Sequence, residues 1–195
     1  LIPQTAWSLL YVDSEETIGE DGAAENVFDG DPNTIWHTQW YPNSPPHPHE
    51  VQINLGNTYV IQGFRYLPRQ DPVNRGGYNG SIKDWEFYVS SDGINWGSPV
   101  ATGTFPKDQT EKEILFPQVS GQYVRLVALS EVNGNPWTTM AELNVVAGVE
   151  DLCPGNEAPN GDIVSPAGDV SILAGETVSF SADCTDPEYD TPYDY

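Results

Sequence analysis

Short segments in which apolar and polar residues alternate recur along most of the chain, and this pattern constrains the fold more than any other feature. Gly, Pro, Asn and Asp residues that favour tight turns separate them. The segments are VQINL (51–55), YVIQGFRY (59–66), DWEFYVS (84–90), EKEILF (111–116), QYVRLVAL (122–129) and AELNVV (141–146). Helix-like composition is confined to GAAENVF (22–28). Because period-two alternation is typical of half-buried strands, we predict an all-β fold, an antiparallel β-sandwich.

The chain of 195 residues is strongly acidic, with 29 Asp and Glu against 7 Lys and Arg and a formal net charge of −22. Such a charge repels polyanions, so we expect no nucleic-acid partner and no binding to anionic membranes. The sequence contains no apolar run of about 18 residues that would predict a transmembrane helix. The start LIPQTAW lacks the basic segment of a signal peptide, so we expect a mature or trimmed N-terminus.

The composition changes near Gly148. All seven basic residues and all six Trp precede residue 138. We assign residues 1–148 to a first domain, the Pro/Gly/Asn-rich residues 149–160 to a linker, and residues 161–195 to a second β segment. The alternation of Val178, Phe180 and Ala182 resembles the opening strands of PKD and Ig-like modules. Such modules need roughly 80 to 100 residues, so we expect residues 161–195 to be the N-terminal part of a truncated module.

The chain has two cysteines, Cys153 and Cys184. Together with the high acidity and the many Gly, Pro and Asn residues, they fit a secreted protein with one disulfide. The alternative is a pair of free thiols. We predict the Cys153–Cys184 disulfide and an extracellular location.

Motifs that mark common catalytic centres are missing from the sequence. It contains no G-x-S-x-G, no H-E-x-x-H, no phosphate-binding glycine loop and no C-x-x-C. Among 29 acidic residues, a catalytic carboxylate pair cannot be assigned from sequence. His47 and His49 could offer two imidazoles to zinc, but a third ligand at usable spacing is missing. We predict no catalytic residue, and expect any catalysis (hydrolase, lyase or oxidase) to belong to a longer parent protein.

The stretch TIWHTQWY (34–41) places His37 among Trp36, Trp40 and Tyr41. One interpretation makes these residues core aromatics with a satisfied histidine, and Trp36 fits that role. The other makes the cluster a sugar-binding surface. A sugar ring presents C–H groups on one side and hydroxyls around its edge, so its receptor needs an aromatic platform beside charged or amide hydrogen-bonding groups. The residues His37, Trp40, Arg69 and Asn79 provide that combination.

The order of several blocks along the chain resembles a known family. These are AENVFDGDPNTIWHTQW, PHEVQINLG, GFRYLPRQD, NGSIKDWEFYVSSDGINWGSPVATGTF and YVRLVALSEVNGNPWTTMAELNV. The chain resembles the coagulation factor 5/8 type C, or discoidin, domain over about residues 5 to 147, and within it carbohydrate-binding module family 32. It is also similar to the N-terminal domain of galactose oxidases. The resemblance implies an eight-stranded jelly-roll sandwich with a structural calcium and a shallow galactose site on loops at one end.

The resemblance also implies a set of sugar contacts. By position in the family blocks they are His37, Arg69 and Asn79, the aromatic Trp40, the carboxylate Glu20 and a second platform, Trp137. The chain departs from the family in the longer segment RQDPVNRGGYNG (69–80), which leaves Asn74, Arg75 and Tyr78 to reshape one wall of the site. Preference among galactose, N-acetylated and acidic sugars stays open at this point.

Calcium is the one cofactor that the sequence leads us to expect. The side chains of Asp29, Asp31 and Thr34 put oxygen donors on one tight loop, and Glu142 could complete the shell. Their alternative role is ordinary turn chemistry. By the resemblance, Asn26 and Ala141 would add backbone carbonyls.

From these observations we expect a non-catalytic carbohydrate-binding module of a larger secreted glycan-degrading enzyme, monomeric and selective for galactose-configured sugars. The alternative is a discoidin-type adhesion module that binds protein or another glycan.

Overall fold

The computed structural model describes residues 1–149 and, beyond them, four short strands: β9 (Ile163–Ser165), β10 (Ser181–Ala182), β11 (Cys184–Thr185) and β12 (Pro192–Tyr193). The chain divides into two units, Leu1–Val149 and Glu150–Tyr195. In the second unit β10 pairs with β9, and β11 with β12. Apart from Val149 and the backbone of those four strands, residues 149–195 lie outside the described residues. The predicted disulfide, linker and Ig-like module therefore stay predictions.

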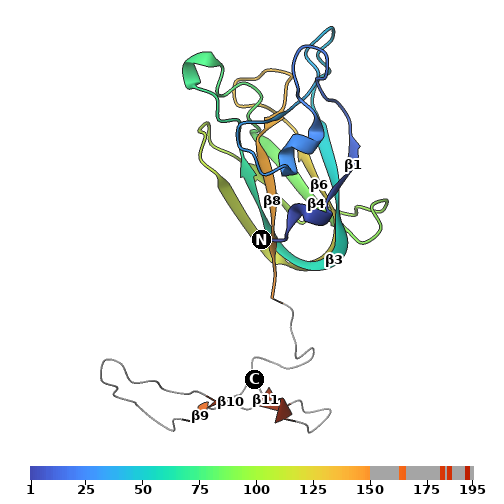
Figure 1. Ribbon diagram of the computed structural model, residues 1–195, viewed down its shortest axis with the longest axis vertical. Coiled ribbons are helices and arrows are strands. Elements are labelled where there is room, and N and C mark those ends of the chain that lie inside the picture. The colour runs from blue at the N-terminus through green and yellow to red at the C-terminus, as the bar shows by residue number, and fades with distance from the viewer. Residues whose placement is uncertain (150–162, 166–180, 183, 186–191, 194–195) are drawn as a thin grey trace, which may run out of the picture. The chain divides into compact units, whose positions relative to one another are not determined.

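The first unit is built almost entirely of strands (Figure 1). They are β1 (Ser8–Val12), β2 (Trp36–His37), β3 (His49–Leu67), β4 (Asp84–Ser90), β5 (Ala101–Thr104), β6 (Lys112–Ala128), β7 (Thr139–Met140) and β8 (Glu142–Ala147). Its helices are three short 3₁₀ turns: η1 (Gln4–Ala6), η2 (Ala24–Phe28) and η3 (Val73–Arg75). The all-β prediction is confirmed. No helix of the described residues is long and apolar enough to cross a bilayer.

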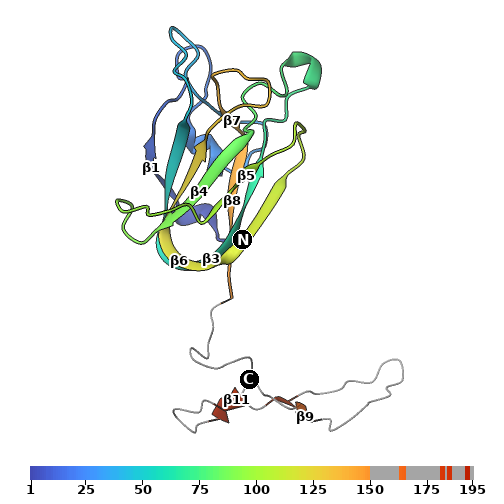
Figure 2. The same cartoon turned by 180° about the vertical axis from the view of Figure 1, so that it is seen from behind.

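The long antiparallel pair of β3 and β6 runs through both layers of the sandwich. The first half of β3 pairs with β1 and with the second half of β6, which also pairs with β4. The second half of β3 pairs with β8 and with the first half of β6. Figures 1 and 2 show both strands curving from one layer into the other. The sequence predicted separate strands at 51–55 and 59–66, but Gly56, with φ of 84°, turns the chain without ending the strand.

Aromatic side chains fill the space between the two layers. Phe64 of β3 stacks on Phe87 of β4 with ring centroids 4.2 Å apart, and meets Trp85 edge-on at 5.2 Å. Phe105 in turn stacks on Trp85 and on Tyr66, both at 4.9 Å. The rings of these five residues are at most 4% exposed. Burial on this scale, and not the loops, stabilises the sandwich.

His47 and His49 both contact the loop that precedes β7, and His47 Nε2 lies 3.0 Å from Thr138 Oγ1. The buried His49 ring contacts Asp13 Oδ2 at 2.7 Å through Nδ1 and the Pro136 carbonyl at 2.8 Å through Nε2. Since both partners are acceptors, both ring nitrogens donate, and the Asp13 hydrogen bond helps raise the pKa of His49 despite its burial. The described residues contain no group of three or more His, Cys, Asp or Glu side chains that could hold a metal ion.

The N-terminus and the last strand of this unit lie together, at the end of the sandwich opposite the long connecting loops. The Ile2 amide donates to the carbonyl of Val145 on β8 at 2.9 Å. Figure 2 shows the N-terminus at the lower end of the sandwich and the long connecting loops at the upper end. The upper end is where the candidate site lies.

Candidate functional site

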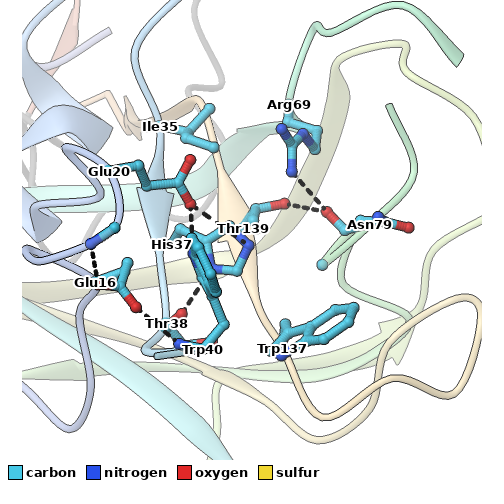
Figure 3. A network of polar contacts seen from close by, with 12 residues as sticks. Glu16, Glu20, Ile35, His37, Thr38, Trp40, Arg69, Asn79, Trp137 and Thr139 are labelled. Atoms are coloured by element: carbon cyan, nitrogen blue, oxygen red, sulfur yellow. Dashed lines mark hydrogen bonds and ion pairs between the residues drawn. The ribbon is translucent and has the colours of Figure 1, made fainter. Parts of the chain in front are cut away.

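Strands β2 and β7, of two residues each, separate the core residue Trp36 from His37, which the sequence predicts to contact a sugar. Strand β2 pairs with β7, with Trp36 opposite Met140 and His37 opposite Thr139. Successive side chains of a strand point to opposite faces. Trp36 therefore enters the core, where it is 1% exposed and its Nε1 donates to the Ser14 carbonyl. His37 faces the other side, which is the pocket (Figure 3).

The hydrogen bonds of His37 define its protonation. Its Nδ1 lies 2.6 Å from the Thr38 carbonyl, which can only accept, so Nδ1 carries the proton. Burial, the largest cause, lowers the pKa of His37 below 6.5, and Arg69 also lowers it. The ring is therefore neutral at pH 7, and its Nε2 is an acceptor, 3.9 Å from Glu20 Oε1. A ligand hydroxyl can donate to that nitrogen.

The exposed ring of Trp40 forms one wall of the pocket. It is 40% exposed, and Tyr41 beside it is 55% exposed. The indole Nε1 donates to Glu20 Oε1 at 2.9 Å, which fixes the ring and the carboxylate together. Gly19 packs on the same ring, since a Cβ added there would lie 2.6 Å from Trp40 Cζ2. Of the aromatics in TIWHTQWY, Trp36 is thus core and Trp40 and Tyr41 are surface.

The buried carboxylate of Glu16 holds this wall in place (Figure 3). Its Oε1 accepts from the amides of Ile18 and Gly19, both at 2.8 Å. Its Oε2 accepts from the amides of Trp40 and Tyr41, at 3.0 and 2.9 Å. These bonds, led by that of Gly19, lower the pKa of Glu16 to about 2, so the carboxylate is charged. One side chain thereby joins the loop before Glu20 to the segment that carries Trp40.

Arg69 and Asn79 form the opposite wall. Arg69 follows the end of β3, and its Nε and Nη2 donate to Asp71 Oδ2 at 2.9 and 2.6 Å. Its Nη1 lies 3.5 Å from the Asn79 carbonyl, which also accepts from Thr139 Oγ1 at 2.8 Å. These contacts orient the guanidinium and leave an N–H on each Nη for a ligand. The Asn79 side-chain amide makes no hydrogen bond to another described residue.

These walls enclose a shallow pocket of about 340 Å³. Its lining residues are Glu20, His37, Trp40, Arg69, Arg75, Asn79 and Trp137. Six of the eight predicted sugar-contact residues are thus brought together. Asn74 is exposed and outside the lining, and the ring of Tyr78 instead faces the ammonium group of Lys107, 5.3 Å from the ring centroid. Of Asn74, Arg75 and Tyr78, the three residues expected to reshape one wall, Arg75 lines the pocket.

The predicted calcium ligands lie in a separate region. Asp29 accepts from the Asp31 amide and from Thr34 Oγ1, both at 2.8 Å. The Asp31 carboxylate instead accepts from Asn33. Glu142 is 6% exposed, and its Oε1 has no hydrogen-bond partner among the described residues. Burial, with the charge of Asp29, raises the pKa of Glu142 to about 7.

The backbone at the two remaining predicted calcium ligands is ordered. The side-chain amide of Asn26 donates to the carbonyls of Asp21 and Ile35, and the Ala141 amide donates to the carbonyl of Leu67. Ala141 is fully buried. These contacts fix the segments whose carbonyls the family resemblance assigns to the ion.

Residues 11–143 match the model of the F5/8 type C domain. The chain belongs to the F5/8 type C domain family. It is 42% identical over 146 residues to a sialidase of Micromonospora viridifaciens and 40% identical over 163 residues to a galactose oxidase of Gibberella zeae. The matches cover 74% and 80% of this chain but 22% and 23% of those proteins, so this F5/8 type C chain spans about a quarter of the curated relatives.

Two solved family 32 modules from Clostridium perfringens have the same fold. CpGH89CBM32-5, solved with GalNAc-β-1,3-galactose, is 35% identical with a TM-score of 0.67, over 75% of this chain and 99% of that one. The NanJ module, solved with galactose, is 30% identical with a TM-score of 0.63, over 74% and 96%. This F5/8 type C domain is therefore a carbohydrate-binding module of the family 32 type in its structure.

Glu16 is the residue of this site that the sequence did not single out. Among 29 acidic residues, nothing in its neighbourhood marks it as buried. No local signal could have found it, because two of its four amide partners, Trp40 and Tyr41, lie 24 and 25 positions away.

We predict that Glu16→Gln destabilises the domain, because an amide NH₂ cannot accept from two of the four amides that the carboxylate satisfies. The melting temperature at pH 7 should fall by about 5 °C or more. A pKa lowered from 4.5 to about 2 gives stability that is present above pH 4.5 and lost as pH falls toward 2, so the two proteins should converge in that range. Scanning calorimetry from pH 7 to 2, with exposed Glu25→Gln as control, measures this; a constant difference would contradict it.

Proposed function

We propose that residues 1–149 form a non-catalytic module that binds galactose-configured sugars in the pocket around His37. The observation that carries this proposal is the grouping of His37, Arg69 and Asn79 beside the exposed ring of Trp40. The ring offers an apolar face to the C–H side of a sugar at low entropic cost. Around it stand a neutral imidazole acceptor, an oriented guanidinium and an amide that can both donate and accept.

The relatives support the sugar class and the setting. Two solved modules of at least 30% identity were determined with galactose or with GalNAc-β-1,3-galactose. The relatives include a sialidase and a galactose oxidase, and this domain corresponds to about a quarter of the length of each. We infer that the domain directs a longer, secreted glycan-degrading protein to its substrate.

Arg69→Ala should weaken galactose binding at least tenfold while changing stability little. An open site that grips one ring gives a dissociation constant of about 1 mM, or about 4 kcal/mol, and loss of charge-assisted hydrogen bonds removes a large part of it. The Arg69 side chain is 13% exposed, but its partner Asp71 is 45% exposed, and an ion pair that is open to solvent on one side adds little to folding. Calorimetry with galactose and lactose tests this. Arg65→Ala, which breaks the ion pair between Arg65 of β3 and Glu113 of β6, is the control and should bind normally.

Galactose affinity should also depend on the protonation of His37. Its Nε2 accepts only while the ring is neutral, and its pKa is lowered below 6.5 by burial. Affinity should therefore be constant above pH 7 and fall as the pH drops through that lowered pKa. Titrations between pH 8 and 5 measure this. An affinity that rises on acidification would show that His37 donates from Nε2.

We further propose a structural calcium held by Asp29, Thr34 and Glu142, with the carbonyls of Asn26 and Ala141. The residues fit a cation because the Glu142 carboxylate is buried beside Asp29 with one oxygen unpartnered. Two neighbouring carboxylates of which one is buried are costly without a positive charge. When bound, the ion would supply that charge and fasten the loop after η2 to the start of β8. Asp31, whose carboxylate accepts from Asn33, would contribute mainly by shaping the loop.

Removing calcium should lower the melting temperature by about 5 to 10 °C, since an ion bound only to the native state stabilises it by about 3 kcal/mol at a hundred times its dissociation constant. Differential scanning calorimetry in EDTA, and then in excess Ca²⁺, measures the shift in melting temperature and its reversal. Glu142→Gln should respond much less to EDTA. If EDTA leaves the melting temperature unchanged and elemental analysis of the untreated protein finds no calcium, the residues serve only as turn-forming residues.

A further inference from the structure

Arg75 stands apart from the other basic residues of the chain. Six of the seven have a partner: Arg65 with Glu111 and Glu113, Arg69 with Asp71, Lys83 with Asp84, Lys107 with Asn133, Lys112 with Asp108, and Arg125 with Glu50. Within residues 1–149, the Arg75 guanidinium makes no ion pair or hydrogen bond. The chain has 29 acidic residues, yet the one basic side chain without a partner among residues 1–149 lines the pocket.

The loop that carries Arg75 is tied down at its base. The side-chain nitrogen of Gln109 lies 2.9, 2.7 and 3.2 Å from the carbonyl oxygens of Arg69, Asp71 and Gly77, and its two N–H groups are shared among these three acceptors. The Arg75 amide donates to the Pro72 carbonyl at 2.7 Å and closes the η3 turn. The turn thus presents Arg75 from a backbone that is held by hydrogen bonds.

The same loop is continuous with the sugar site. Gly76 follows Arg75 with a left-handed φ of 89°, and its carbonyl accepts from the Asn79 amide at 2.7 Å. A Cβ added to Gly76 would lie 3.0 Å from Asn79 Nδ2. The segment that sets Arg75 at the rim therefore also sets Asn79, so both side chains face the same ligand.

Two charged side chains that line the pocket, Arg75 and Glu20, have no oppositely charged partner among the described residues. Asp71 balances Arg69 through two hydrogen bonds, and His37 is neutral at pH 7. Glu20, in the loop after β1, accepts a hydrogen bond from the uncharged Trp40 indole. The Glu20 carboxylate opposes an anion close to its own wall of the pocket, whereas the acidic residues farther away are screened by salt beyond about 8 Å. A contact made at the rim with Arg75 is screened far less.

We propose that Arg75 gives the module a preference for galactose-configured sugars that carry an anionic group, either a sulfate ester or a carboxylate, on the bound ring or next to it. A guanidinium matches both groups because its planar fork can donate two parallel hydrogen bonds to their oxygens. This inference rests on the proposed sugar-binding function and names a narrower class of ligand for the same pocket.

The test is calorimetry on the full chain with methyl β-galactoside, galactose 3-sulfate, galactose 6-sulfate and galacturonic acid. At least one anionic sugar should bind about fivefold more tightly than the neutral one at low salt, and this ratio should shrink at high salt. The sulfated and carboxylate ligands distinguish the two sources of charge. Arg75→Gln should bring the ratio close to one. Lys83→Gln, the same change of charge at a residue outside the pocket, should leave the ratio as in the wild type.

Two results would overturn the inference: no anionic sugar binds more tightly than the neutral one, or the preference survives in Arg75→Gln. If the wild type binds methyl β-galactoside but shows no preference, this inference fails and the proposed function stands. If the wild type binds none of the four sugars, the proposed function itself fails. Melting curves of both variants establish that each is folded.

Discussion

The antiparallel pairing of β3 with β6 is the constraint on which the rest of the domain depends. These two strands belong to both layers: β1, β4 and β8 each pair directly with one of them, and β5 joins the sheet through β4. The passage between layers needs a phase change, because buried positions in β3 are odd-numbered up to Ile61 and even-numbered from Phe64. The bulge between Ile61 and Gly63 accounts for this change of phase. Position 63 needs a glycine, because a Cβ there would lie 2.4 Å from the Ile114 carbonyl oxygen.

The side chains that line the pocket are not carried by that main sheet. They come from segments outside it: the loop after β1, strand β2 and the chain following it, the loop after β3 and the loop before β7. What keeps them in register is a set of polar contacts, of Glu16 with four amides, Asp71 with Arg69, and Gln109 with three carbonyls. Residues that touch the ligand can therefore vary while the sandwich keeps its stability, as expected when a rigid scaffold carries function on loops.

The sequence predicted the layers well because alternation reports burial directly, as in Trp85, Phe87 and Val89 of β4. The site followed largely from the family resemblance, whereas residue type alone could not separate Trp36 from Trp40, whose exposures differ fortyfold. Two kinds of feature escaped. Strand continuity at Gly56–Thr58 was missed because those residues also favour turns. Glu16 was missed because burial of a carboxylate depends on amides from residues 24 and 25 positions away, a tertiary property that no local pattern encodes.

The proximity of the domain's two ends, joined by the Ile2–Val145 hydrogen bond at the pole opposite the pocket, makes the fold suitable as a cassette. A polypeptide that enters beside η1 and leaves after β8 does so without crossing the approach to His37 and Trp40. Duplication or transfer of such a unit between genes would need no remodelling of its recognition surface. The occurrence of related sequences in a sialidase and in a galactose oxidase, enzymes of unlike chemistry, fits this kind of recombination.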